Sequence, residues 1–140
     1  MKQKSWILRV VPLLIILTLL LVACGSVPAS WEDATYKKDA TVGDGATTVT
    51  VKVTADEKTV TLTLKTDEDT LADAMLAEEL CSGDEGDFGL YIKYVNGIRA
   101  DYDLDGGYWW NLIVNGEAST VGASGTPIKA GDVYEFVRTK

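Results

Sequence analysis

One stretch of the chain decides the fold, and it reads DGGYWWNLIVNG from Asp105 to Gly116. It follows a Gly-Gly pair and closes on an Asn-Gly pair, both of which are typical of turns. In a β-strand, the side chains between these pairs would alternate between two faces. One face would carry Tyr108, Trp110, Leu112 and Val114, and the other would carry Trp109, Asn111, Ile113 and Asn115.

The two faces of this strand suit different roles. The first is apolar throughout and suits a core, whereas the second mixes an indole with two amides and suits contact with another molecule. We therefore predict that Trp110 is a core residue and that Trp109 is a contact residue. The alternative is that both tryptophans pack in the core. An error of one residue in the register would exchange the two roles.

The first 23 residues have the composition of a signal peptide. Residues 1–9 carry three basic side chains, and residues 10–22 are almost wholly apolar. That run is shorter than the roughly 20 residues of a membrane-spanning helix. It ends in Leu21-Val22-Ala23-Cys24, which resembles a bacterial lipobox. The resemblance implies that Cys24 is lipidated and that the protein is an exported, membrane-anchored lipoprotein on the extracytoplasmic face. An uncleaved anchor, the alternative, would leave the domain on the same side.

The mature chain is expected to be strongly acidic. The whole chain holds 13 Lys and Arg against 21 Asp and Glu; the signal peptide takes three of the basic residues, which leaves 10 against 21 and a net charge of −11. Nucleic acids require a basic surface, so they are excluded as partners. Anionic lipid headgroups would also repel the protein, so two acyl chains on Cys24 would hold it at the membrane.

The absence of histidine limits the chemistry of the chain. It removes the usual general base, the usual zinc ligand and every Ser-His or Cys-His pair. Neighbouring carboxylates such as Glu78 and Glu79 are expected by chance in so acidic a chain. We therefore predict a protein that is not an enzyme and needs no cofactor.

The chain has two cysteines, and the lipid would occupy Cys24. Cys81 then has no partner for an intrachain disulfide. A reactive thiol is one interpretation. A small, partly buried apolar residue is the interpretation we favour.

The mature chain divides into a tether and one domain. Residues 24–46 are rich in small and polar side chains without periodicity. As a flexible tether, they would reach about 26 Å. Residues 47–140 suffice for one domain with one core.

Periodicity and turn residues predict the elements of this domain. Residues 47–54 and 59–65 alternate and predict an antiparallel hairpin. Thr70 would cap a helix over 71–81 that Gly83 stops, and 82–87 would be an acidic loop. Further strands are expected over 90–95, 98–102, 108–114 and 133–138. This order favours an α+β fold, a β-grasp-like antiparallel or mixed sheet packed on one helix.

Asp101, Asp103 and Asp105, followed by Gly106, match the start of an EF-hand calcium loop. The match ends there, because the twelfth position is Leu112 instead of a bidentate Glu. A calcium site formed by these three aspartates is one interpretation, and a solvated acidic turn is the other.

Four motifs, taken in their order and spacing, resemble those of a family of unknown function related to the C-terminal domain of transcobalamin and intrinsic factor. They are Thr70-Leu71-Ala72-Asp73-Ala74-Met75-Leu76, Tyr94-Val95-Asn96-Gly97-Ile98, Tyr108-Trp109-Trp110 with Val114-Asn115-Gly116, and Gly131-Asp132-Val133-Tyr134. In those proteins the domain is β-grasp-like and closes over one face of cobalamin, while a helical barrel holds the other face. The resemblance implies a ligand-facing surface formed by Tyr108, Trp109, Trp110, Asn111 and Asn115.

The 140 residues contain no counterpart of that helical barrel. Three alternatives therefore remain: a partner chain completes the site, the ligand is a different molecule, or the surface binds another protein. We predict a lipid-anchored extracytoplasmic binding protein that captures a small ligand, such as a corrinoid, at its aromatic strand. The competing prediction is a surface adhesion or protein-interaction module in which the same aromatics bind a partner.

Overall fold

The structure is a computed structural model of the chain, and it describes residues 26–140. The predicted signal peptide over 1–23 and the predicted lipidation site Cys24 lie outside this range. Within residues 26–140, no helix is both long and apolar enough to cross a membrane.

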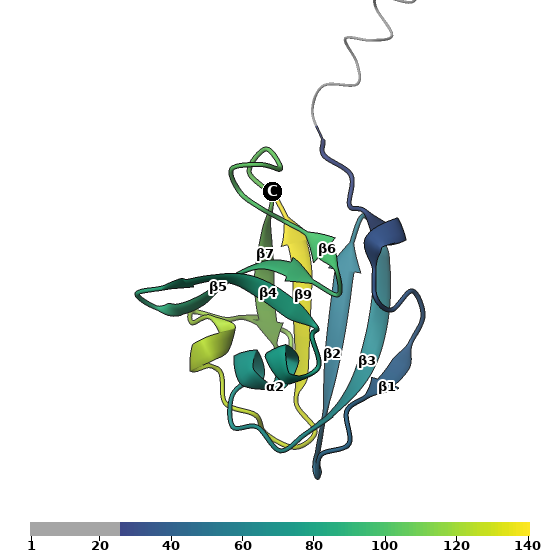
Figure 1. Cartoon of the computed structure of the whole chain (residues 1–140), viewed down its shortest axis with the longest axis vertical. Coiled ribbons are helices and arrows are strands. Elements are labelled where there is room, and N and C mark those ends of the chain that lie inside the picture. Colours follow the sequence, from purple (N-terminus) through teal and green to yellow (C-terminus); the bar gives the residue numbers. More distant parts are fainter. Residues whose placement is uncertain (1–25) are drawn as a thin grey trace, which may run out of the picture.

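Six strands form the larger, mixed sheet (Figure 1). They are β1 (Ala40–Val42), β2 (Thr47–Ala55), β3 (Lys58–Thr66), β7 (Trp109–Val114), β8 (Glu117–Ala118) and β9 (Val133–Thr139). Their order across the sheet is β1-β3-β2-β9-β7-β8. The β1–β3 and β2–β9 pairs are parallel, and the other pairs are antiparallel. The parallel β2–β9 pair therefore joins the N-terminal hairpin to the C-terminal strand at the centre of the sheet.

A second layer covers one face of this sheet (Figure 1). It consists of the helix α2 (Leu71–Ala77) and a three-stranded antiparallel sheet of β4 (Cys81–Gly86), β5 (Gly89–Val95) and β6 (Ile98–Arg99). Two 3₁₀ turns, η1 (Trp31–Asp33) and η2 (Ala123–Gly125), complete the described elements. Every second residue of β2 and β9 is buried toward this layer, as one covered face requires.

The protein is thus mostly β with one short helix. The predicted mixed sheet and the predicted antiparallel hairpin, β2–β3, are confirmed. The hairpin strands pair in a register that runs from Thr47–Thr66 to Ala55–Lys58. The predicted share of helix is too large, because α2 has only about two turns and the second sheet covers the remaining apolar surface. Because valines and threonines alternate in β2, as they do in a half-buried strand, the sequence was sufficient to predict the hairpin.

The predicted helix over 71–81 ends early, at Ala77. Its start is as expected, because the Thr70 hydroxyl accepts a hydrogen bond from the amide of Asp73 at 3.2 Å. At its end Glu79 takes a left-handed conformation with a φ of 55°. The amide of Leu80 then donates to the carbonyl of Met75 at 2.8 Å. Because Leu80 is buried, its packing turns the chain out of the helix before the predicted stop.

The acidic loop predicted over 82–87 is instead the strand β4, paired with β5. Its side chains beyond Cys81 are all exposed, so no alternation of polarity marks it as a strand. Gly83, predicted as the helix stop, lies at a bulge in this pair, where a Cβ would stand 1.8 Å from the carbonyl oxygen of Tyr91. The glycine is therefore needed for close approach of two strands and not for the end of the helix.

The flexible tether predicted over 24–46 is wrong for most of its length. Trp31 donates its indole N–H to the carbonyl of Ala55 at 2.9 Å. The backbone of Tyr36 bonds the side-chain amide of Asn96 in both directions, each at 2.8 Å. Farther on, β1 adds a parallel strand to β3. Since long-range contacts hold this segment, the folded domain begins well before Thr47.

The thiol of Cys81 is expected to resist alkylation in the native protein. The residue is buried, and this burial raises the pKa of the thiol to about 12. At pH 8 roughly one thiol in ten thousand would be ionised, and the thiolate is the reactive form. Mass spectrometry of a Cys24→Ala chain treated with iodoacetamide checks this: labelling should appear only in denaturant. Native labelling at the rate of the unfolded chain would contradict it.

Candidate functional site

A shallow groove of about 130 Å³ opens where the two layers meet beside β7. The residues that line it are almost all apolar: Leu90, Tyr91, Ile92, Trp109, Trp110, Leu112, Gly122, Ala123 and Phe136. They come from β5, β7, β9 and the segment that enters η2. Next to the groove, the edge of β7 is left unpaired from Trp109 to Asn111, because β8 pairs only with Ile113 and Val114 and the amide of Ser119 bonds Leu112.

The two tryptophans have the roles predicted from the alternation. Trp109 is 39% exposed and Trp110 is 7% exposed, so the predicted register is confirmed. The indole N–H of Trp110 donates to the carbonyl of Lys93 on β5 at 3.2 Å. This bond ties β7 to the second sheet. Trp110 therefore belongs to the base of the groove, and Trp109 forms part of its accessible wall.

The other three predicted ligand-binding residues do not line this groove. The ring of Tyr108 is partly buried, and the guanidinium of Arg138 lies 4.0 Å from its centre. Asn115 forms the predicted tight turn with Gly116, and its side chain bonds Asp132 at 3.1 Å and the amide of Val133 at 2.9 Å. Asn111 is partly exposed on the same face of β7 as Trp109, opposite Trp110, but it does not line the groove. The structure thus brings together the two tryptophans alone from the predicted set.

Residues of β5 complete the groove, and sequence reasoning missed them. Tyr91 is 49% exposed at the opening, between the less exposed Leu90 and Ile92. The amide of Leu90 donates to the hydroxyl of Ser124 at 3.0 Å, which fixes β5 to η2. Three apolar residues in a row, without alternation, are a signal that both faces of a strand meet apolar surface. Nothing local indicates that β7 provides the other wall.

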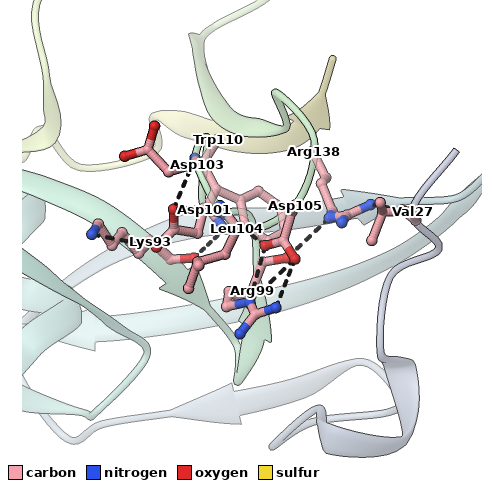
Figure 2. Close-up of polar contacts among 9 residues, drawn as sticks. All are labelled: Val27, Lys93, Arg99, Asp101, Asp103, Leu104, Asp105, Trp110 and Arg138. Atoms are coloured by element: carbon pink, nitrogen blue, oxygen red, sulfur yellow. Dashed lines mark hydrogen bonds and ion pairs between the residues drawn. The ribbon is translucent and has the colours of Figure 1, made fainter. Parts of the chain in front are cut away.

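Asp105 holds the loop that leads from β6 to β7 (Figure 2). Its carboxylate accepts hydrogen bonds from Arg99, from Nε at 3.0 Å and from Nη2 at 2.8 Å. It also accepts one from the amide of Asp101 at 2.8 Å. The side chain is buried, and the hydrogen bonds from Arg99 keep the pKa of Asp105 below its usual range despite that burial.

Asp101 closes the same loop from inside. Its carboxylate accepts the amides of Leu104 at 3.2 Å and Asp103 at 3.0 Å and lies 3.3 Å from the ammonium of Lys93. The amide of Leu104, followed by Lys93, lowers the pKa of Asp101. Figure 2 shows the carboxylate of Asp103 on the outside of the loop.

The calcium site proposed for the three aspartates is therefore not formed in this arrangement. Two of the carboxylates are turned to internal amides and cations, and the third is exposed. Across residues 26–140, no three or more acidic, cysteine or histidine side chains are placed to hold a metal ion. The aspartates shape a loop, which is closer to the acidic-turn interpretation.

A comparison with known protein families identifies the family of this chain. Residues 68–137 match the domain of unknown function DUF4430. The chain belongs to this family. The matched region of this DUF4430 chain runs from just before α2 into β9 and contains both tryptophans and the rest of the groove. A comparison with curated protein sequences finds no match.

Two solved structures are similar to the DUF4430 chain. The first is a protein of Ruminococcus gnavus ATCC 29149, described as a candidate metal-binding protein, with a TM-score of 0.62 and 28% identity over 68% of this chain and 98% of that one. The second is haptocorrin in complex with Cbi (cobinamide), with a TM-score of 0.51 and 20% identity over 70% of this chain and 26% of that one. The predicted relation to the transcobalamin family is thereby confirmed as a likeness of fold. Both neighbours are binding proteins and not enzymes.

Proposed function

We propose that this DUF4430 chain is a lipid-anchored extracytoplasmic binding protein that captures a small ligand with a flat ring system in the groove beside β7, with a corrinoid as the ligand class. The observation that carries the proposal is Trp109, which stands 39% exposed at the wall of an apolar groove whose base contains Trp110. An indole half in water gains by covering its face with another ring system.

The shape of the groove supports binding of one face of a ligand. Pockets that enclose a drug-sized molecule have volumes of roughly 300–1,000 Å³, and the groove is much smaller. A macrocycle would therefore lie on Trp109 and Tyr91, and its other face would need a second surface. In haptocorrin the similar region makes up only 26% of the chain, so additional protein is present there. We also propose that this mixed sheet with its short helix is a β-grasp-like fold.

The anchor of the proposed protein is Cys24. Its lipobox-like sequence context supports lipidation, and two acyl chains give stable membrane attachment. The acidic surface would keep the domain in the aqueous phase. Export and lipidation together place the groove outside the cytoplasm, where it would meet ligands taken up from the surroundings.

Titration with cobinamide and cobalamin tests the ligand. Residues 24–140 with Cys24→Ala are titrated while tryptophan fluorescence is followed, and calorimetry gives a second readout because corrinoids absorb light. We expect saturable binding by the parent chain and a loss of at least tenfold in affinity for Trp109→Ala. Trp31→Phe is the matched control, since Trp31 lies on the opposite part of the sheet at Ala55. No binding at tens of micromolar by a folded protein would exclude the corrinoid.

One observation favours the second candidate function, a surface adhesion or protein-interaction module. Phe88, at the tip of the β4–β5 hairpin, is 98% exposed. Exposed aromatics of this kind often carry the binding energy of protein interfaces. Beads coated with the protein should then adhere to cell surfaces, and Phe88→Ser should abolish adhesion while Trp109→Ala should not. No adhesion by the parent chain would exclude this candidate, and adhesion that survives Phe88→Ser would exclude Phe88 as the contact.

A further inference from the structure

The N-terminal segment is fastened to one end of the domain from Val27 onward. The carbonyl of Val27 accepts a hydrogen bond from Nη1 of Arg138 at 2.6 Å (Figure 2). The amide of Ala29 donates to the carboxylate of Asp56 at 2.6 Å. Trp31 follows with its bond to Ala55. Successive contacts to the C-terminal strand and to the β2–β3 turn fix the direction in which the chain leaves the domain.

The proposed lipidation residue comes shortly before this attachment in the sequence. Cys24 precedes Val27 by three residues. Three residues span at most about 11 Å, whatever their conformation. If Cys24 carries the lipid, as proposed above, the membrane surface must lie beside the end of the domain at which Val27 is bound. A free tether of some twenty residues would have imposed no such restriction.

The loop between β6 and β7 lies at the end of the domain where the described N-terminal segment begins and where the C-terminus lies (Figure 1). A Cβ on Gly106 of this loop would stand 3.7 Å from Cγ2 of Val27. Tyr102 is 60% exposed and Leu104 is 69% exposed. The bonds made by Asp101 and Asp105 fill the inside of the loop, which leaves these two apolar side chains outside.

We propose that loop 101–107 is a membrane-contacting surface, and that Tyr102 and Leu104 touch the interfacial region of the bilayer that holds Cys24. Tyrosine is enriched at this depth, where its ring is apolar and its hydroxyl reaches water. Because the protein is acidic, the fitting lipid is zwitterionic. The end of the domain that carries this loop then faces the membrane. This inference rests on the proposed lipid anchor.

Site-specific labelling of the full lipidated chain in phosphatidylcholine vesicles tests the orientation. An environment-sensitive fluorophore is attached to Leu104→Cys or, as the matched control, to Ala130→Cys. Residue 130 lies at the other end of β2, since the amide of Gly131 bonds Thr48, and the strand separates the two ends by about 27 Å. The buried Cys81 stays unlabelled. Lipids with a nitroxide headgroup should quench the label at 104 at least threefold more than the label at 130.

Flotation of the vesicles separates failure of the anchor from failure of this inference. A protein that floats but shows equal quenching at both positions, or none, overturns the membrane-contacting surface and leaves the anchor intact. A protein that does not float, or a Cys24→Ala chain that floats equally well, overturns both. Inserting a ten-residue Gly-Ser linker after Gly25 should preserve flotation and reduce the preference for position 104. Unchanged preference with the linker would show that the short attachment does not orient the domain.

Discussion

Replacing Trp110 with alanine is expected to lower the free energy of unfolding by about 3–5 kcal/mol. The side chain is 7% exposed, so its removal leaves a cavity between β7 and β5. It also leaves the carbonyl of Lys93 without the indole donor that lies 3.2 Å away. Urea denaturation followed by far-ultraviolet circular dichroism measures the loss without using tryptophan as the probe.

Trp109→Ala is the matched control for this loss. Because Trp109 is 39% exposed, its truncation should cost about 1 kcal/mol or less. Trp110→Phe, which keeps most of the volume but loses the hydrogen bond, should fall between the two. Equal destabilisation by Trp109→Ala and Trp110→Ala would contradict the division of roles between the two indoles. It also follows that Trp109 is the proper residue for testing ligand binding, because its removal leaves the fold intact.

Replacing Asp105 with alanine is expected to destabilise the protein by about 2 kcal/mol at pH 7. The carboxylate is buried and accepts hydrogen bonds from Arg99 and from the amide of Asp101. Since the folded-state pKa of Asp105 is lowered, its contribution is fully present above the unfolded-state pKa of about 3.9. It is lost as the pH falls below about 4. The difference between the parent chain and Asp105→Ala should therefore shrink in acid.

Urea denaturation between pH 2.5 and pH 7 measures this pH dependence. Asp105→Asn should be less destabilising than the alanine variant at pH 7, because the amide keeps one acceptor. Since the amide carries no charge, the free energy of unfolding of this variant should fall less steeply in acid than that of the parent chain. Asp103→Asn is the matched control in the same loop, since its carboxylate is exposed and should matter little. A destabilisation by Asp105→Ala that is the same at pH 3 and pH 7 would exclude the ion pair as its cause.

The β2–β3 hairpin shows what local sequence can reveal. Alternating valines and threonines over 47–54 match the two faces of a half-buried strand, and the structure pairs them as predicted. The Asn96-Gly97 and Asn115-Gly116 turns have positive φ at both residues, as their sequence requires. The opposite burial of Trp109 and Trp110 follows from the same alternation. These features depend on residues that are close together in the sequence, so they could be predicted without knowledge of the fold.

β4 and the N-terminal segment show the limit of such reading. β4 is acidic and glycine-containing, and only its pairing with β5 makes it a strand. Tyr36 is held by Asn96, 60 residues later, and nothing near either residue indicates this contact. Propensity and periodicity describe a segment by itself, whereas these segments are ordered by surfaces formed elsewhere in the chain.

The sequence alone determined that this is an acidic, histidine-free chain with a lipobox-like sequence over Leu21-Val22-Ala23-Cys24, a set of alternating strands and an aromatic strand with one core face and one exposed face. Local alternation and turn chemistry suffice for each of these properties. The tertiary structure alone decided that β5 and β7 share a groove, that the carboxylates of Asp101 and Asp105 face inward, and that Val27 is bound beside the loop 101–107. Each of these depends on side chains far apart in sequence, which burial and hydrogen bonding bring together only after the sheet has formed.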